Sequence, residues 1–393
     1  MNKLLKLALA VFLWSFLQSY PAIACRYNVR EVGFVDLGIE SYFLYGYVDK
    51  KTSAEITLSF EQIAYAALLD SNIKFEIIDV NQQKDHPAIK YLDSSQVQTF
   101  PSAALVSPDG QTLAVAVTKP GEPFEQTLRS ALEDISSSPK RREILQQVSK
   151  AYGVVLLIES ADAGQNKKAR EAARGAIEQI ASQMEYLPKP IAHPPAMVEI
   201  SHESLAREKV LLWSLALDPN DIDQPHAAVL YGRARWIGPM FIGEQITEDN
   251  LAAVLFVIGA DCECGFDQRW LQGTMLPARW DQKLLSVVAE SLGFDPENPM
   301  IKAEISWIVR RGYPAYPGVP LRQAQGMALG YQELVVESEP NIAYSVQPTA
   351  YSVQHTDLNA KRYTLYAIFV GGLAVLVVAI GLFIAFGTSR KNL

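Results

Sequence analysis

The residues whose spacing most clearly suggests chemistry are two cysteines one residue apart, Cys262 and Cys264. A Cys-x-Cys pair can close a small, strained disulfide, whose relatively oxidising potential makes it labile or catalytic. It can equally be a structural disulfide, or one of the two thiols can bond to Cys25. The chain has three cysteines in all, too few for a disulfide scaffold, so its domains must depend on apolar burial.

The same two thiolates could supply half of a soft-metal site for Zn²⁺ or Cu(I). A histidine would complete such a site, and the candidates are His193, His202 and His226. Two cysteines without a second ligand pair at fixed spacing fall short of a zinc signature. The sequence therefore predicts no cofactor, with a metal held by Cys262, Cys264 and His226 as the alternative.

Two arginine–tryptophan pairs follow the cysteines, Arg269-Trp270 and Arg279-Trp280. An arginine beside a tryptophan can present a cation–π surface to a partner, which makes these four residues candidate binding residues. The other interpretation is that the tryptophans cover a core while the arginines face water. The sequence contains no P-loop, Gly-x-Gly-x-x-Gly, Gly-x-Ser-x-Gly or His-Glu-x-x-His motif, so it predicts no catalytic residue outside the cysteine pair.

A long apolar segment near the C-terminus, residues 363–386, predicts a transmembrane helix. No charged residue occurs between Arg362 and Arg390. As a helix the segment would be about 36 Å long, enough to cross a hydrocarbon core of about 30 Å. Residues 387–393 would then form a short tail on one side of the membrane and residues 337–362 a flexible stalk on the other.

The N-terminus predicts the direction of that helix. Residues 1–24 combine a basic start, an apolar segment and the small-residue ending Ala22-Ile23-Ala24, which is typical of a secretory signal. We therefore expect residues 25 to about 360 to be exported and residues 387–393 to be cytoplasmic. The chain has no N-x-[ST] sequon, which favours a bacterial envelope over an ER-derived location. The expected protein is a single-pass inner-membrane protein with a periplasmic bulk.

Cys25 directly follows the expected cleavage site and has two interpretations. A bacterial lipoprotein would carry lipid on this cysteine, although Ala22 stands where such signals usually carry Leu, Val or Ile. The alternative is an ordinary cleavage site followed by a free or disulfide-bonded cysteine. A lipid would add little to a protein that a spanning helix already holds.

Composition limits the partners of the exported part. All 43 acidic residues lie between the two apolar segments, together with 29 of the 35 basic residues. Such an acidic excess argues against nucleic acid and anionic lipid headgroups as general partners. The roughly 330 residues between the segments are enough for two domains of ordinary size.

One order of elements occurs twice in this region: strand, helix, strand, helix, proline, hairpin, helix. In the first copy we expect a strand at 42–48, a helix at 59–71, a strand at 74–80, Pro101, a strand at 111–117 and a helix at 122–137. In the second we expect a strand at 154–159, a helix at 167–184, a strand at 197–201, Pro225, a strand at 236–246 and a helix at 248–259.

This plan resembles the thioredoxin fold, twice. The most specific segment runs from Phe75–Asn81 through Tyr91 to Thr99-Phe100-Pro101 and the turn Pro108-Asp109-Gly110, and it is similar to the second strand, next helix, cis-proline approach and hairpin of thioredoxins. The resemblance implies an α/β fold with two β-α-β-α-β-β-α domains, over 25–139 and 140–265. In that family the backbone next to the cis-proline meets an extended peptide. The resemblance thereby implies Phe100, Pro101 and Pro225 as binding residues.

The chain departs from the family where thioredoxins carry Cys-x-x-Cys at the start of the first helix. The corresponding stretches are Asp49-Lys50-Lys51-Thr52 and Ala161-Asp162-Ala163-Gly164, and neither contains a cysteine. A helix start lowers a thiol pKa, so dithiol chemistry at the usual place requires a cysteine there. The departure predicts redox-inactive modules that bind or act as scaffolds.

Residues 266–336 are expected to form a Trp/Arg loop and a small helical appendix, with helices at 282–292 and 300–310. Taken together, these features predict an exported, membrane-anchored binding or scaffold protein with a protein partner in the envelope, such as a transporter complex. The alternative is an envelope thiol-disulfide or metal-handling protein that uses Cys262 and Cys264.

Overall fold

The computed structural model describes residues 26–38, 40–94, 99–187, 189–260 and 273–311. All of them belong to the first of two compact units, Met1–Leu334 and Val335–Leu393. The predicted signal, Cys25, the Cys262–Cys264 pair, the stalk and the apolar segment 363–386 lie outside the described residues. None of the helices in the described ranges combines the length and hydropathy that crossing a bilayer requires.

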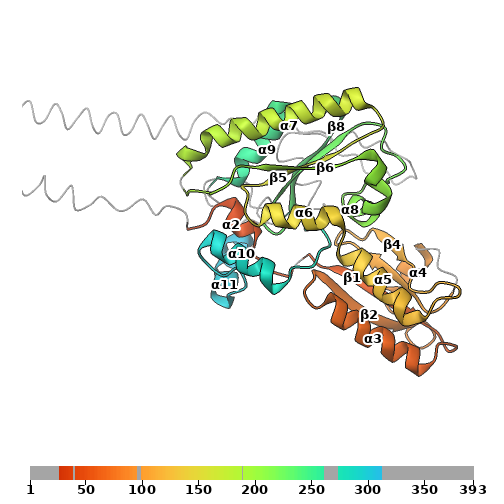
Figure 1. The fold of residues 1–393 in the computed structure, drawn as a ribbon. Helices are drawn as coiled ribbons and strands as arrows, with labels where there is room; N and C mark the ends of the chain where they lie inside the picture. Colours follow the sequence, from red (N-terminus) through yellow and green to blue (C-terminus); the bar gives the residue numbers. More distant parts are fainter. Residues whose placement is uncertain (1–25, 39, 95–98, 188, 261–272, 312–393) are drawn as a thin grey trace, which may run out of the picture. The chain divides into compact units, whose positions relative to one another are not determined.

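The first domain contains a four-stranded sheet in the order β2-β1-β3-β4. Its strands are β1 (Tyr42–Val48), β2 (Ile73–Asp79), β3 (Ser102–Val106) and β4 (Thr112–Val115). β1 and β2 are parallel, whereas β3 is antiparallel to both β1 and β4. α3 (Ala54–Leu68) and α5 (Phe124–Ser136) enclose the main core with one face of this sheet, and the six-residue α4 (Ile89–Ser94) packs on the other face (Figure 1).

Alternation along β1 decides which residues enter that core. Tyr42 and Leu44 are fully buried against Phe60 and its neighbours, while Phe43 and Tyr45 project from the opposite face and are only half-buried. Successive side chains of a strand point to opposite faces, so an apolar strand presents apolar groups on both. The first sheet thus has one well-covered face and one partly covered face.

The second domain repeats the arrangement with a sheet in the order β6-β5-β7-β8. Its strands are β5 (Val154–Ile158), β6 (Ala196–Ile200), β7 (His226–Tyr231) and β8 (Arg235–Ile242). β5 is parallel to β6, and the other two pairs are antiparallel. Strand order, direction and connection match the predicted β-α-β-α-β-β-α plan in both domains, which makes each of them thioredoxin-like.

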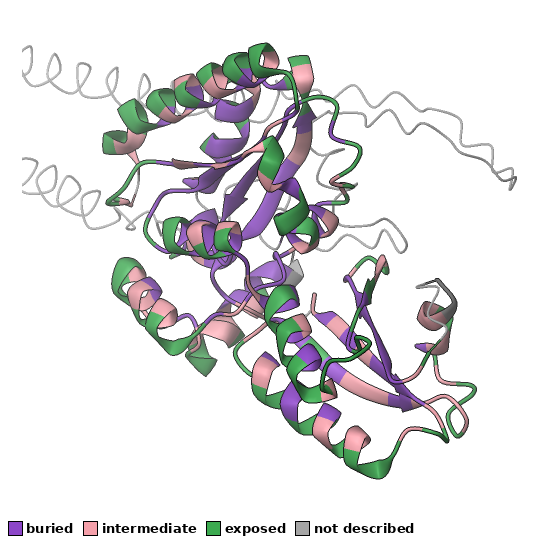
Figure 2. Cartoon of the chain, turned by 45° about the vertical axis from the view of Figure 1, so that its right-hand side comes forward, coloured by how far each residue is buried: buried purple, intermediate pink, exposed green. Residues whose placement is uncertain are grey.

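Helices cover both faces of the second sheet (Figure 1). One face holds α7 (Ala163–Gln183), α9 (Glu248–Ile258), α2 (Val29–Gly33) and α11 (Pro299–Arg311). The other holds α6 (Pro139–Val148), the 3₁₀ helix η2 (His202–Glu208), α8 (Lys209–Ser214) and α10 (Gln282–Leu292). In Figure 2 the central strands of this sheet are buried along their whole length, whereas β1 of the first sheet includes half-buried residues.

Residues 26–38 pack with the second domain, although the sequence placed them at the start of the first. Arg235 donates from Nε to the carbonyl oxygen of Gly33 at 2.8 Å and from Nη2 to that of Val35 at 3.0 Å. The amide of Val29 donates to the carbonyl oxygen of Ala260 at 3.0 Å. These bonds and the burial of α2 in the second core attach the segment to residues about two hundred positions away.

The element boundaries agree with the sequence prediction in some places and differ in others. β1 and α10 begin and end where predicted. α3 and α7 begin earlier than predicted, at the N-caps Ser53 and Asp162. The predicted strand 236–246 stops at Ile242 because Gly243 takes a left-handed φ of 55° and starts the 3₁₀ helix η3 (Gly243–Gln245). The helix that the plan placed before Pro225 without bounds is formed by η2 and α8. α2 and α6 were not predicted, nor was the 3₁₀ helix η1 (Met184–Tyr186).

Candidate binding surface of the first domain

The peptide bond between Phe100 and Pro101 is cis, as the resemblance implied. β3 begins directly after it, with Ser102 opposite Tyr47 of β1. Continued by two residues, this register brings Phe100 opposite Asp49, where β1 has ended. The proline therefore stands at the sheet end that faces the start of α3, the position at which a thioredoxin meets its peptide partner.

The start of α3 is closed by polar side chains. The Asp49 carboxylate accepts hydrogen bonds from the amides of Lys51 at 3.0 Å and Thr52 at 3.1 Å and from the Thr52 hydroxyl at 3.0 Å. The hydroxyl of Ser53 accepts from the amide of Ile56 at 3.3 Å and caps the helix. The backbone amides near this helix start, which would lower the pKa of a thiol there, thus already donate to side-chain oxygens.

The second domain is capped in the same way at α7. The Asp162 carboxylate accepts from the amides of Gly164 at 2.8 Å and Gln165 at 3.1 Å. These hydrogen bonds hold the pKa of Asp162 below its ordinary value, so the cap is an anion at neutral pH. Neither helix start presents a nucleophile.

The two proline positions differ in how their backbone is used. The carbonyl oxygen of Pro225 accepts from the amide of Gly243 at 2.9 Å, and that of Gln224 accepts from the ring Nδ1 of His226 at 2.8 Å. The Gln224–Pro225 bond is trans, and Pro225 is buried. Pro101 is buried too, so what distinguishes the second copy is that backbone oxygens of its proline loop already accept hydrogen bonds from within the domain.

The first copy leaves its proline loop unengaged. Within the described part of the chain, no hydrogen bond involves the main chain of Phe100. Ser102, which follows Pro101, has a buried hydroxyl that finds no hydrogen-bond partner there. Buried polar groups are nearly always paired, so this stretch has unused hydrogen-bonding capacity next to the half-exposed Phe100.

Four aromatic rings lie on the partly covered face of the first sheet, and Phe100 of this loop is one of them. Phe43 and Tyr45 stack with centroids 5.6 Å apart, and Tyr45 and Tyr91 stack at 5.8 Å. Phe100 packs against the same small cluster as Tyr45 and Tyr91. All four are half-buried. We call Phe43, Tyr45, Tyr91 and Phe100 the aromatic surface.

The electrostatics of the aromatic surface favour contact with a polypeptide. The Lys74 Nζ lies 5.5 Å from the Phe43 ring centroid and the Lys90 Nζ lies 4.8 Å from that of Tyr91, so cations border the rings. Burial raises the pKa of Tyr45, helped by Glu76 and Tyr91, which keeps the phenol protonated and able to donate. Rings with a hydrogen-bonding tip are what protein interfaces favour.

The predicted pair Arg279-Trp280 is internal. Trp280 is 2% exposed in the core of the second domain, and the cation over its ring is the guanidinium of Arg233 at 5.4 Å. Arg279 donates from Nη2 to Glu133 at 3.1 Å, within the described residues of the first domain. The interpretation as a core tryptophan holds for Trp280, whereas Arg269 and Trp270 lie outside the described residues.

The predicted metal ligands are not brought together in the described ranges. His193 and His202 are exposed, and His226 is buried at the start of β7, where burial lowers its pKa. No group of three or more histidine, cysteine or carboxylate side chains with metal-binding geometry occurs among the residues that the structure describes. Cys25, Cys262 and Cys264 lie outside them.

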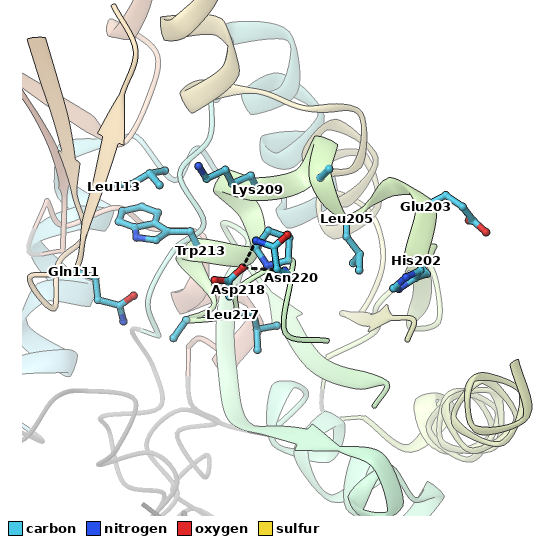
Figure 3. A pocket seen from close by; sticks show the side chains of 13 residues that line it. Gln111, Leu113, His202, Glu203, Leu205, Lys209, Trp213, Leu217, Asp218 and Asn220 are labelled. Atoms are coloured by element: carbon cyan, nitrogen blue, oxygen red, sulfur yellow. Dashed lines mark hydrogen bonds between the residues drawn. The ribbon is translucent and has the colours of Figure 1, made fainter. Parts of the chain in front are cut away.

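A separate pocket of about 650 Å³ lies beside α8 (Figure 3). Leu113 of β4 lies near Trp213 and Lys209. The side chains of Leu113 and Trp213 pack against the core of the first domain. Asp218 accepts from the backbone and side-chain nitrogens of Asn220 at 2.8 and 2.9 Å. The lining mixes both signs of charge and contains no arrangement of catalytic groups.

The sequence matches no known protein family and no curated protein. Among solved structures, the zinc-bound form of human ERp44 is 12% identical, with 55% of each chain covered and a TM-score of 0.22. The first two thioredoxin domains of Saccharomyces cerevisiae Eps1p are also 12% identical, over 61% of this chain and 98% of theirs, with a TM-score of 0.20. The bb fragment of ERp72 is 15% identical over 57% and 90%, with a TM-score of 0.19.

The matched region spans about half the length of ERp44. Identities and scores at this level concern fold alone. The thioredoxin-like assignment depends on the strand order, strand directions and cis-proline of the chain itself.

Proposed function

We propose that this protein is a non-catalytic binding or scaffold protein of the bacterial envelope, whose first domain binds a partner polypeptide through the aromatic surface. The observation that carries the proposal is the pairing of a half-exposed aromatic cluster with an unengaged proline loop, opposite a helix start that is capped without a thiol. A thioredoxin-like peptide edge that lacks the cysteines can still bind.

The proposed partner is an extended polypeptide segment with acidic side chains. β2 is an edge strand of the first sheet, and an extended segment can add to such an edge through main-chain hydrogen bonds. Lys74 and Lys90 would meet carboxylates beside the rings. The acidic excess of the chain argues against nucleic acid as the occupant.

The proposed location rests on sequence. The signal at 1–24 and the apolar segment 363–386 would leave the two domains outside the cytoplasmic membrane, tethered by residues 337–362. A tether and one anchor suit an accessory subunit that holds a second protein next to the membrane, including a subunit of a transporter.

The test is site-specific photo-crosslinking of the full chain in native membranes. A photoreactive phenylalanine analogue replaces Tyr45 or Tyr91, and a matched probe replaces Tyr186 of the second domain, which is 78% exposed. We expect one and the same polypeptide, identified by mass spectrometry, from positions 45 and 91 and not from 186. Identical products from all three positions, or none from the first two, would contradict the proposal.

Two variants keep the result interpretable. Phe43→Ser should weaken crosslinking from position 91 by about tenfold or more, since aromatic anchors dominate interface energies. Its half-exposed site should leave thermal unfolding nearly unchanged, which circular dichroism checks. The double variant Cys262→Ser, Cys264→Ser should crosslink like the wild type. Loss of capture in that variant would favour the thiol-disulfide or metal-handling alternative.

A further inference from the structure

A second pocket, of about 410 Å³, lies between α6 and α10 in the second domain. Both helices pack against the same core, so the walls of the pocket are fixed by buried residues on each side. Figure 1 shows the two helices next to one another. No part of the proposed binding surface contributes to it.

The charge of the pocket is opposite to that of the chain. Arg142, Lys150, Arg279 and Lys283 line it, and the lining contains a single carboxylate, Asp281. The chain as a whole carries a formal charge of −8. Four cations from two segments, residues 142–150 and 279–283, therefore converge on one concavity in an otherwise acidic protein, and such a site attracts anions.

Hydrogen bonds hold the two arginines in place. Arg279 donates from Nη2 to the carbonyl oxygen of Ala67 at 3.2 Å and to the Ser136 hydroxyl at 3.1 Å, in addition to its ion pair with Glu133. Arg142 donates from Nη1 to the Ser137 hydroxyl at 2.9 Å. Guanidinium groups that are oriented in advance lose little entropy when they bind an oxyanion.

Of the other charged residues in the pocket, the two lysines are free to bind an anion, and the one carboxylate already caps a helix. Lys150 and Lys283 are exposed, and their side chains form no ion pair within the described part of the chain. Asp281 caps α10 by accepting from the amide of Leu284 at 2.8 Å, so part of its charge serves the helix. Two carboxylates, Asp281 and the Glu133 that pairs with Arg279, therefore stand against four cations, and a cationic excess remains.

The floor of the pocket is apolar. Leu145 is 6% exposed, and Leu284 packs against the same core beside it. Val287 lines the pocket one turn further along α10. An inorganic ion would leave these side chains against water, whereas an apolar group attached to the anion would cover them.

We infer that this pocket binds a phosphate group attached to an apolar body. Four cations match the charge and the several acceptor oxygens of a phosphate ester, and arginine pairs well with phosphate oxygens. The apolar floor takes the attached group. Two sources share this chemistry, a soluble phosphate ester and the headgroup region of an anionic phospholipid.

The test uses the full chain in phosphatidylcholine nanodiscs and isothermal titration calorimetry with phenyl phosphate as the probe. We expect phenyl phosphate to bind more tightly than inorganic phosphate. In Lys150→Gln, Lys283→Gln the affinity for phenyl phosphate should fall by about tenfold or more, because charge-assisted contacts are lost. Both lysines are exposed, so this variant should fold normally.

The matched control is Lys167→Gln, Lys168→Gln on α7, which removes the same charge from another exposed face and should bind like the wild type. Nanodiscs that also contain phosphatidylglycerol distinguish the two sources. Weaker titration of phenyl phosphate in those discs identifies the lipid headgroup, and unchanged titration identifies a soluble ester. No binding of either phosphate probe, or equal losses in both double variants, would overturn the inference.

Discussion

The two sheets share strand order and connections, yet their outer faces are covered to different extents. The strands β3 and β7 are buried throughout in both sheets, and the difference lies in the strand beside them. Every residue of β5 is buried, whereas β1 alternates between buried and partly exposed residues from Tyr42 to Tyr45. α6, α8 and α10 cover the second sheet on the face where, among the described residues, the first has the six-residue α4 alone. The partly exposed face of the first sheet is therefore the one that carries the aromatic surface, for which a binding role is proposed.

The largest expected effect tests whether the second domain depends on its N-terminal segment. Arg235 is 1% exposed and donates to the carbonyl oxygens of Gly33, Val35 and Gly273. Arg235→Met removes three hydrogen bonds to buried carbonyl oxygens, together with the charge that made them strong, which should lower the free energy of unfolding by about 3–5 kcal/mol.

Hydrogen exchange measured by mass spectrometry locates the loss caused by Arg235→Met. Amides of β5 and β7 should exchange much faster, while those of β1 and β3 should keep their protection. Equal acceleration in both sheets would show that the two domains unfold as one unit, and the comparison would fail.

A smaller effect is expected from Gly33→Ala. A Cβ atom at Gly33 would lie 2.4 Å from the ring of Tyr231 and 3.3 Å from Cα of Gly232. Overpacking of this kind costs about 1–3 kcal/mol, and urea unfolding measures it. Combining Gly33→Ala with Tyr231→Leu should cost less than the sum of the two single changes, because the ring that clashes is gone. If the two free-energy changes simply added, the clash between residue 33 and the Tyr231 ring would not be the cause of the destabilisation.

Acid should weaken the second domain more than the first. His226 occupies the first position of β7, and burial lowers its pKa below the ordinary 6.5. The unfolded chain then binds the proton more readily, so stability falls as the pH drops below about 6.5, by at most about 1.4 kcal/mol per pH unit. Its counterpart in β3 is Ser102, which does not titrate.

Urea unfolding of the wild type and His226→Gln at several pH values between about 5 and 7.5 measures this dependence. In His226→Gln, the unfolding free energy of the second domain should fall less steeply as the pH drops than it does in the wild type. Identical slopes in the two proteins would exclude His226 as the cause.

The smallest effect concerns Ala216, which ends α8 with a left-handed φ of 59°. The amides of Leu217 and Ala216 donate to Leu212 and Trp213, a helix-ending geometry that glycine adopts more easily. Ala216→Gly should stabilise the second domain by about 0.5–1 kcal/mol in thermal unfolding. The same change at Ala206, inside η2, should destabilise it by a similar amount.

Local patterns sufficed for the elements whose signals lie within a few residues. β1 is a continuous apolar run, and α10 has the cap Asp281 and the left-handed Gly293 at its ends. α6 was missed because Pro139-Lys140-Arg141-Arg142 begins it with charge, and its three buried aliphatic residues are too few for a clear period. Ser53 and Asp162 were visible N-cap signals that would have corrected the starts of α3 and α7.

The aromatic surface could be predicted only in part. Phe100 was identified through the cis-proline, but Phe43 and Tyr45 alternate with the buried Tyr42 and Leu44 in one apolar strand. Such a strand predicts burial on both faces. Which face stays open depends on where helices from distant parts of the sequence pack. Trp280 is the opposite case, a residue predicted as a candidate for binding that is buried. It is buried because segments far away in sequence build the core around it.

The packing of α2 has a consequence for the order in which the chain is made. Gly33 leaves the ribosome early, but Arg235, which binds its carbonyl oxygen, is translated 202 residues later. The sheet of the first domain and the α5 helix that covers it are complete at Ser136, long before that point, so this domain can form most of its core while α2 is still unpaired with Arg235. The second domain can pack against residues 26–38 only after Arg235 has been made. These residues, the first of the described chain to be translated, are therefore among the last to fold.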